Sequence, residues 1–141
     1  MIDILLVEDN AGDAFLLQKA FDLGKIANHI NVVTDGREAV AFLRGEGQYA
    51  GSPRPDLIIL DLNMPEMDGR EALSLIKTDP ALLSIPVIVL TTSSDEHDVA
   101  KSYKHHVNCY IKKPTKVRDF LSIVKAIEYF WASIVSLPED E

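Results

Sequence analysis

An alternation of short apolar runs with segments of helical period constrains the fold of this chain more than any other feature. The apolar runs are expected strands, and they lie at Asp3–Val7, Asn31–Thr34, Leu57–Leu60, Val87–Leu90 and Cys109–Lys112. Helices are expected near Ala11–Leu23, Gly36–Arg44, Gly69–Thr78, Glu96–His105 and Lys116–Val135. This alternation is typical of an α/β protein with a parallel sheet, and continuously apolar strands indicate helices on both faces of that sheet.

Three of the expected strands run directly into charged residues. Glu8 and Asp9 follow the first strand, Asp61 follows the third, and Lys112 and Lys113 lie at the end of the fifth. Because the carboxyl ends of parallel strands form one crevice, we expect the three acids and a lysine to meet there. Neighbouring carboxylates repel by about 4 kcal/mol per pair at an effective dielectric of about 20. A hard divalent cation relieves this repulsion, and Mg²⁺ is the expected ion.

Asp61 is the expected nucleophile of this site. Mg²⁺ typically binds only one or two carboxylates directly and leaves room for the oxygens of a phosphate group. With a lysine neutralising those oxygens from the far side, in-line attack by the Asp61 carboxylate on a phosphoryl group would give an aspartyl phosphate.

The acidic pair Glu8–Asp9, the run around Asp61, Thr91 at the end of the fourth strand and Lys113–Pro114 together resemble the receiver domain of two-component response regulators. The resemblance extends over nearly the whole chain. It implies a single domain over residues 1–141, with a doubly wound, five-stranded parallel sheet in the flavodoxin-like order 2-1-3-4-5.

This resemblance also implies a role for each residue of the acidic site. Asp61 would accept the phosphoryl group from a histidine kinase. Asp9, Asp61 and the backbone carbonyl of Asn63 would bind Mg²⁺ directly, whereas Glu8 would act through water.

The same resemblance implies a switch beside the acceptor. Thr91 would hydrogen-bond a phosphoryl oxygen, and the side chain of Tyr110 would change rotamer on phosphorylation. Alternation along the strand sends Lys112 and Lys113 to opposite faces, and the resemblance selects Lys113 as the phosphoryl partner because it directly precedes Pro114. The Lys113–Pro114 peptide bond would be cis.

The chain also resembles the small receivers that accept phosphate from phytochrome-type light-sensing kinases. The shared features are the opening run from Leu6 to Asp13, the Gly- and Pro-rich segment from Arg44 to Pro55, and Leu90–Ser93. This implies a phytochrome-type histidine kinase as the partner, with a downstream protein target that the sequence does not identify.

The main alternative is a Mg²⁺-dependent phosphohydrolase that forms an aspartyl phosphate. Such enzymes of the haloacid dehalogenase type place a second aspartate two residues after the nucleophile as a general acid–base. Here that position is Asn63, which cannot transfer protons. The sequence therefore favours a switch that catalyses only its own phosphorylation and dephosphorylation over an enzyme with turnover.

Composition and charge limit the binding partners and the cellular compartment that we expect for this chain. With 22 acidic and 14 basic residues, the net charge of −8 disfavours binding to a nucleic-acid backbone. We see no signal peptide and no apolar stretch of membrane-spanning length. Cys109 is the only cysteine, as expected for a cytoplasmic protein without disulfides.

The last helix, expected over about residues 116–137, is apolar around more of its surface than one core-facing stripe requires. Its C-terminal half includes Phe130, Trp131 and Ile134. We expect a homodimer that covers these residues, and the alternative is that the helix folds back on its own domain. A short acidic tail, Pro138–Glu141, follows.

Overall fold

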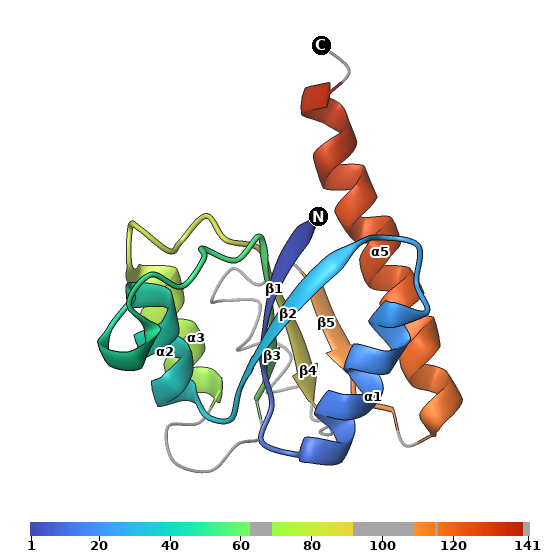
Figure 1. Cartoon of the computed structure of the whole chain (residues 1–141), viewed down its shortest axis with the longest axis horizontal. Coiled ribbons are helices and arrows are strands. Elements are labelled where there is room, and N and C mark those ends of the chain that lie inside the picture. The colour runs from blue at the N-terminus through green and yellow to red at the C-terminus, as the bar shows by residue number, and fades with distance from the viewer. Residues whose placement is uncertain (63–68, 92–108, 115, 140–141) are drawn as a thin grey trace.

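The computed structural model describes residues 1–62, 69–91, 109–114 and 116–139. Its centre is a five-stranded parallel sheet in the order β2-β1-β3-β4-β5, as expected from the sequence (Figure 1). The strands are β1 (Ile2–Val7), β2 (Asn28–Val33), β3 (Leu57–Asp61), β4 (Val87–Thr91) and β5 (Cys109–Lys112).

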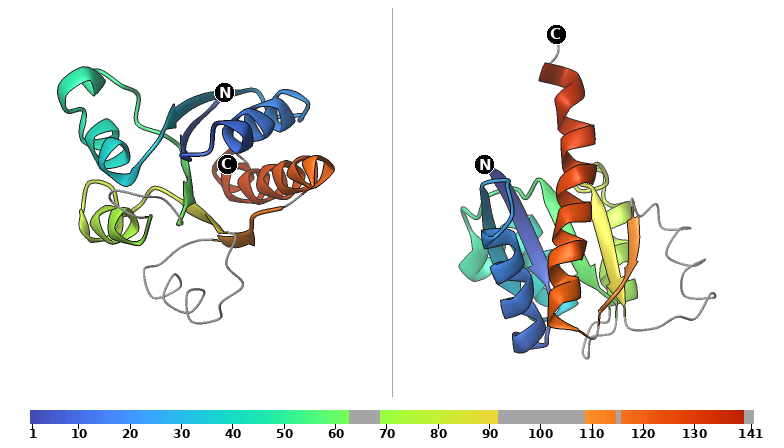
Figure 2. Two further views of the ribbon diagram at one scale, coloured as in Figure 1. Left: turned by 90° about the horizontal axis from the view of Figure 1, so that it is seen from below. Right: turned by 90° about the vertical axis from the view of Figure 1, so that its right-hand side faces the viewer.

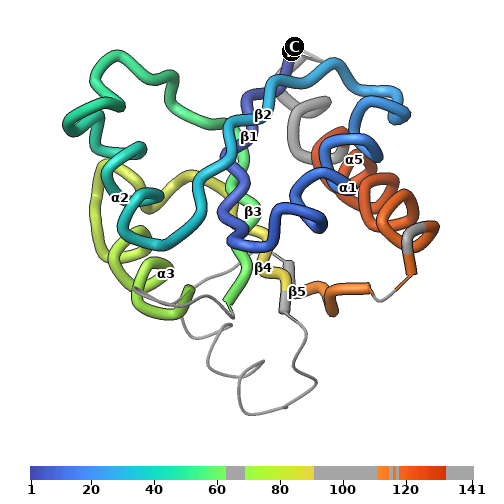
Figure 3. The backbone as a smooth tube through the Cα atoms, turned by 60° about the horizontal axis from the view of Figure 1, so that its bottom comes forward, coloured from blue at the N-terminus to red at the C-terminus, as the bar shows by residue number. Residues whose placement is uncertain are grey.

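Helices cover both faces of the sheet, so the doubly wound α/β architecture is also confirmed (Figures 1 and 2). Helices α1 (Ala11–Asp22) and α5 (Val117–Glu139) lie side by side on one face, and α2 (Gly36–Arg44) and α3 (Gly69–Thr78) lie on the other (Figure 3). The helix expected at Glu96–His105 lies outside the described residues. No helix in the described part of the chain is both long and apolar enough to cross a bilayer.

The core has two halves because successive side chains of each strand point to opposite faces. In β1, Leu5 and Val7 pack with α2 and α3, whereas Ile4 and Leu6 pack with α1 and α5. All four side chains are at most 1% exposed. Burying an aliphatic side chain of this size contributes about 1.5–3 kcal/mol, so the central strands supply much of the stability that holds the site in place.

Helix boundaries follow local capping chemistry. Asp35 precedes α2, and its Oδ1 accepts a hydrogen bond from the Glu38 backbone N–H at 2.7 Å. Glu38 returns the contact through Oε2, which accepts from the Thr34 backbone N–H at 3.0 Å. The first bond satisfies a donor that the first helical turn leaves unpaired, and the second ties the residue before the cap to the helix. Helix α3 ends at Thr78, directly before Asp79–Pro80, as the sequence predicts.

The segment between α2 and β3 is more ordered than its Gly- and Pro-rich composition suggests. It contains a short 3-10 helix, η1 (Gly47–Tyr49), and the Tyr49 hydroxyl donates to Glu38 Oε1 at 3.1 Å. Further along, Arg54 Nη1 donates to the Ala81 carbonyl at 2.6 Å and Nη2 to Ser84 Oγ at 3.2 Å. These bonds join the segment to the loop that leads into β4.

Candidate functional site

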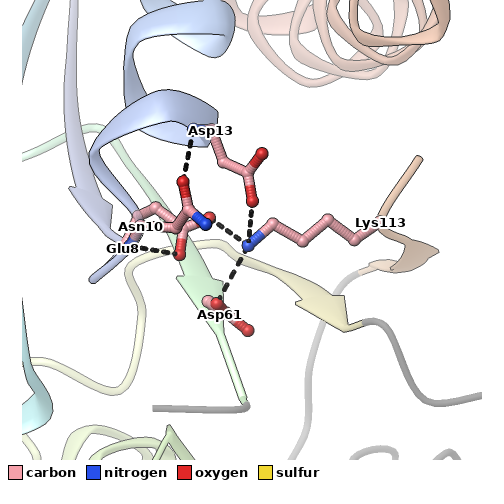
Figure 4. A network of polar contacts seen from close by, with 5 residues as sticks. All are labelled: Glu8, Asn10, Asp13, Asp61 and Lys113. Carbon is pink, nitrogen blue, oxygen red and sulfur yellow. Dashed lines mark hydrogen bonds and ion pairs between the residues drawn. The ribbon is translucent and has the colours of Figure 1, made fainter. Parts of the chain in front are cut away.

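The carboxyl ends of β1, β3 and β5 bring charged residues to one edge of the sheet (Figure 4). Val7 pairs with Leu60, so the next residues on these neighbouring strands are Glu8 and Asp61. Lys113 follows the last residue of β5, and its long side chain reaches to both acids. Asp61 and Lys113 are buried, at 3% and 6% exposure, so their charges interact with little screening by water.

The Lys113 ammonium group forms ion pairs with three carboxylates (Figure 4). Its Nζ lies 3.2 Å from Asp61 Oδ2 and 2.8 Å from Asp13 Oδ2, and it also contacts Glu8 Oε1. Desolvation by itself lowers the pKa of Lys113. Hydrogen bonds to Asp13 and Glu8, together with the charges of Glu8 and Asp61, outweigh desolvation and raise that pKa above its ordinary value. Lys113 is therefore a fixed positive charge at neutral pH.

Glu8 is almost completely buried, with 1% exposure. Burial and the neighbouring Asp61 raise the pKa of its carboxyl group to about 8, although Lys113 by itself lowers that pKa. One carboxylate oxygen, Oε1, contacts Lys113, while Oε2 accepts a hydrogen bond from the Asn10 backbone N–H at 3.3 Å. Both oxygens of Glu8 thus have protein partners.

The acids at this edge form a donor set suited to a hard cation. One carboxylate oxygen each from Glu8, Asp9 and Asp61 lies within 4.8 Å of the others. Hard divalent cations take oxygen ligands of this kind, and a bound cation would offset the repulsion among three neighbouring acids. Asp9 is exposed, so the cluster opens to solvent on its side. The geometry therefore fits a divalent metal ion.

Of the remaining residues expected at the site, the structure places Thr91, Tyr110 and Lys112 in the sheet. Thr91 ends β4 and pairs in register with Lys112, and Tyr110 lies on β5 opposite Val89. Lys112 is exposed whereas Lys113 is buried, which places the two lysines as strand alternation predicts. Asn63 lies outside the described residues.

The Lys113–Pro114 peptide bond is trans, because the described residues contain no cis peptide bond. The cis bond implied by the family resemblance is therefore wrong for this structure. A trans bond is the intrinsically favoured form before proline, by about 0.5–1 kcal/mol.

Asp13 is a site residue that the sequence analysis did not single out. It lies in the first turn of α1, where acids are common because they stabilise the positive end of the helix dipole. Its backbone N–H donates to Asn10 Oδ1 at 2.9 Å, which caps the helix. No feature of the sequence distinguishes it from an ordinary acid of a first helical turn.

Gly69, the first residue of α3, lies against the end of β3. Its backbone N–H donates to the Leu62 carbonyl at 3.3 Å. A Cβ atom at this position would overlap the Asp61 carbonyl oxygen and Leu62 Cα. Only glycine allows the start of α3 to approach β3 so closely.

Residues 4–125 match the family model of the response regulator receiver domain. The match spans most of the chain, and the fold and the acidic site agree with it. The chain therefore belongs to the response regulator receiver family, the phosphoryl-accepting component of two-component signalling.

The similar proteins include a cyanobacterial phytochrome response regulator. The response regulator Rcp1 of Synechocystis sp. is 49% identical over 135 residues, covering 96% of this chain and 92% of Rcp1. The phosphorylated cyanobacterial phytochrome response regulator RcpA is 51% identical with a TM-score of 0.89, covering 95% of this chain and 96% of RcpA. The Mn²⁺-bound form of Rcp1 has a TM-score of 0.87 at 48% identity, covering 93% of this chain and 94% of that chain.

The raised pKa of Glu8 predicts that metal affinity depends on pH. Below about pH 8 a growing share of Glu8 carries a proton in place of its ion pair with Lys113, and a cation that needs the Glu8 charge must displace that proton. We expect Mg²⁺ affinity to rise with pH, by up to about tenfold per unit, and to level off above about pH 8. Titration calorimetry at several pH values measures this slope.

The control for this prediction is Glu8→Gln, which should flatten the pH dependence because it removes the titrating group. Without metal, the folded state holds the Glu8 proton between its ordinary pKa of 4.5 and about 8. The free energy of unfolding should therefore fall as pH rises through that window. A Mg²⁺ affinity that does not change with pH in the parent protein would contradict the raised pKa of Glu8.

Proposed function

We propose that the chain is a phosphorylation-dependent switch in which Asp61 accepts a phosphoryl group from a histidine kinase. The observation that carries the proposal is the placement of Asp61 at the end of β3. This buried carboxylate lies 3.2 Å from the Lys113 ammonium and within 4.8 Å of acid oxygens from Glu8 and Asp9. A carboxylate between a fixed ammonium and a cation site is suited to attack a phosphorus atom.

In the proposed step, a carboxylate oxygen of Asp61 forms a bond to phosphorus while the bond from phosphorus to the donor nitrogen of the kinase histidine breaks. Lys113 supplies positive charge to the equatorial oxygens of the transferring group. A divalent cation held by the acids would supply further charge neutralisation. Thr91 and Tyr110 would then respond to the new charge, which changes the surface that other proteins contact.

We propose Mg²⁺ as the resident cation, bound by Asp9, Asp61 and the backbone carbonyl of Asn63. The oxygen-only donor set favours a hard cation, and the Mn²⁺-bound form of Rcp1 supports divalent binding in a similar protein. Glu8 has both oxygens engaged by Lys113 and the Asn10 backbone N–H, which supports contact with the ion through water.

We also propose that the kinase is of the phytochrome type. Phosphoryl transfer would take place in the cytoplasm, and residues 1–141 would form a single receiver domain. Support for the kinase type comes from the likeness to RcpA, a phytochrome response regulator. The net charge of −8 favours a protein target over a nucleic acid. No turnover of external phosphate esters is proposed, because Asn63 cannot replace a general acid–base.

The test of this function is phosphotransfer from purified histidine kinases, each autophosphorylated and mixed with the chain and Mg²⁺. We expect rapid transfer of one phosphoryl group per chain from a kinase with a phytochrome sensor. Intact mass spectrometry measures the stoichiometry. Continued release of many phosphates per chain from small esters would favour the hydrolase instead.

The C-terminal half of α5 is the proposed homodimer contact. This helix extends beyond the rest of the molecule (Figures 1 and 2). Phe130 and Trp131 are half-buried and pack against the core half shared with α1, whereas Tyr129 is 78% exposed. Packing of α5 against its own domain thus covers Phe130 and Trp131 in part. A second copy of the chain would cover the side chains of this helix that stay exposed, such as Tyr129. The side chain of Ile134 lies outside the described part.

The dimer predicts that Tyr129→Glu lowers self-association, because a charge at the contact must lose water when two copies meet. The change leaves the core intact, since Tyr129 is exposed. Sedimentation across a concentration series measures the effect, and Ser122→Glu, at an exposed position of the same helix, serves as the control. A parent protein that remains monomeric at high concentration would refute the dimer.

A further inference from the structure

Within the described residues, the ammonium group of Lys113 has three carboxylate partners, as many as its N–H donors. A lysine carries three donors and no acceptor. In this site the partners are Glu8 Oε1, Asp13 Oδ2 at 2.8 Å and Asp61 Oδ2 at 3.2 Å, all within reach of one nitrogen (Figure 4). The contact to Asp61 is a hydrogen bond, and the ion pairs with Glu8 and Asp13 restrict how the ammonium group can turn.

Asp13 differs from the other two acids in what it can do. It comes from α1 rather than from a strand end, and it is not one of the three acids whose oxygens converge on the cation site. Its side chain is 27% exposed, and its carboxylate points at Lys113 (Figure 4). The hydrogen bond from its backbone N–H to Asn10 Oδ1, at 2.9 Å, holds its position at the start of the helix.

We propose that Asp13 is a positioning residue for Lys113. Ion pairs with Glu8 and Asp13 hold the ammonium group from two sides, so that its hydrogen bond is aimed at Asp61, the proposed site of phosphorylation. This inference rests on the proposed function of Asp61 and deepens it, because it assigns the control of Lys113 to a residue outside the cation site.

The physical need for such a residue comes from the lysine itself. Its ammonium is a compact charge on a flexible four-carbon stem, with donors that rotate freely. Small misplacements of a group that stabilises a transition state cost large factors in rate. Asp13 holds the ammonium group from the side of α1, so the donor that faces Asp61 does not have to be oriented during transfer.

The test compares Asp13→Ala with the parent protein in two measurements. The first is the ¹⁵N NMR signal of the Lys113 ammonium in the unphosphorylated chain, which we expect to shift and to exchange faster with water when one acid is removed. The second is the rate constant for phosphoryl uptake from acetyl phosphate at saturating Mg²⁺, which we expect to fall by about tenfold.

Two further variants separate positioning from helix stability. Asp119→Ala removes an acid from the first turn of α5, the same kind of helix position, but Asp119 forms none of the ion pairs around Lys113. It should leave the ammonium signal and the uptake rate unchanged. Asp13→Glu keeps the charge at the start of α1 and should recover most of the lost rate.

An unchanged Lys113 ammonium signal in Asp13→Ala would overturn the proposal, and so would an uptake rate equal to or above that of the parent. The NMR comparison does not depend on phosphorylation. If the parent itself takes up no phosphoryl group, the proposed function fails, and the ammonium signal alone then decides whether Asp13 holds Lys113.

Discussion

Asp61→Asn is expected to abolish phosphoryl incorporation. The amide that replaces the carboxylate is not a competent nucleophile, and the change also removes one of the three acids of the cation site. Incubation with acetyl phosphate and Mg²⁺ should add one phosphoryl group to the parent protein and none to the variant. Intact mass spectrometry reads both results directly.

Asp56→Asn is a matched control for that experiment, because Asp56 directly precedes the same strand at its opposite end. Its carboxylate accepts a hydrogen bond from the Asp3 backbone N–H at 2.8 Å, away from the acceptor site. This variant should take up phosphate like the parent. Undiminished incorporation in Asp61→Asn would move the chemistry to another residue.

Among substitutions at the acidic site, Lys113→Met is expected to lower the free energy of unfolding the most. It leaves Glu8 and Asp61 buried without their cation, and breaking a buried ion pair from one side typically costs about 3–5 kcal/mol. Saturating Mg²⁺ should restore part of this loss, because an ion that binds only the folded state stabilises it. Urea unfolding with Mg²⁺ and with a chelator measures both effects.

The same substitution should separate metal binding from switching. Mg²⁺ binding should survive, since Lys113 contacts the acids and is not a metal ligand, but the Tyr110 ring signals should no longer shift on phosphorylation. Lys112→Met, at the exposed neighbouring position, should behave like the parent. A normal phosphorylation-dependent response of Tyr110 in Lys113→Met would refute the role of this lysine.

The sheet and the placement of the acids could be predicted because their causes are local. Continuously apolar strands such as Leu57–Asp61 are buried on both faces. A polar residue that ends such a strand therefore lies where the carboxyl ends of the strands meet. β2 was harder to delimit. It starts at Asn28, three residues before the predicted start, because an edge strand tolerates exposed polar residues such as His29 that interrupt the apolar pattern.

Contacts between distant segments could not be predicted from local pattern. Asp13 has a sufficient local reason to occur in a first helical turn, so nothing in the sequence indicates that it meets Lys113 across a separation of 100 residues. The hydrogen bonds from Arg54 to Ala81 and Ser84 are equally nonlocal. Each depends on how the completed sheet brings two loops together.

The length and attachment of α5 give this protein a lever. The helix has 23 residues, which corresponds to about 34 Å at about 1.5 Å per residue, and it begins four residues after Lys113. A rigid rod of that length multiplies movement at its base: a tilt of about 5° carries the far end through about 3 Å. Motion too small to matter beside the acidic site therefore becomes, at the outer end of α5, a displacement comparable to the width of a side chain.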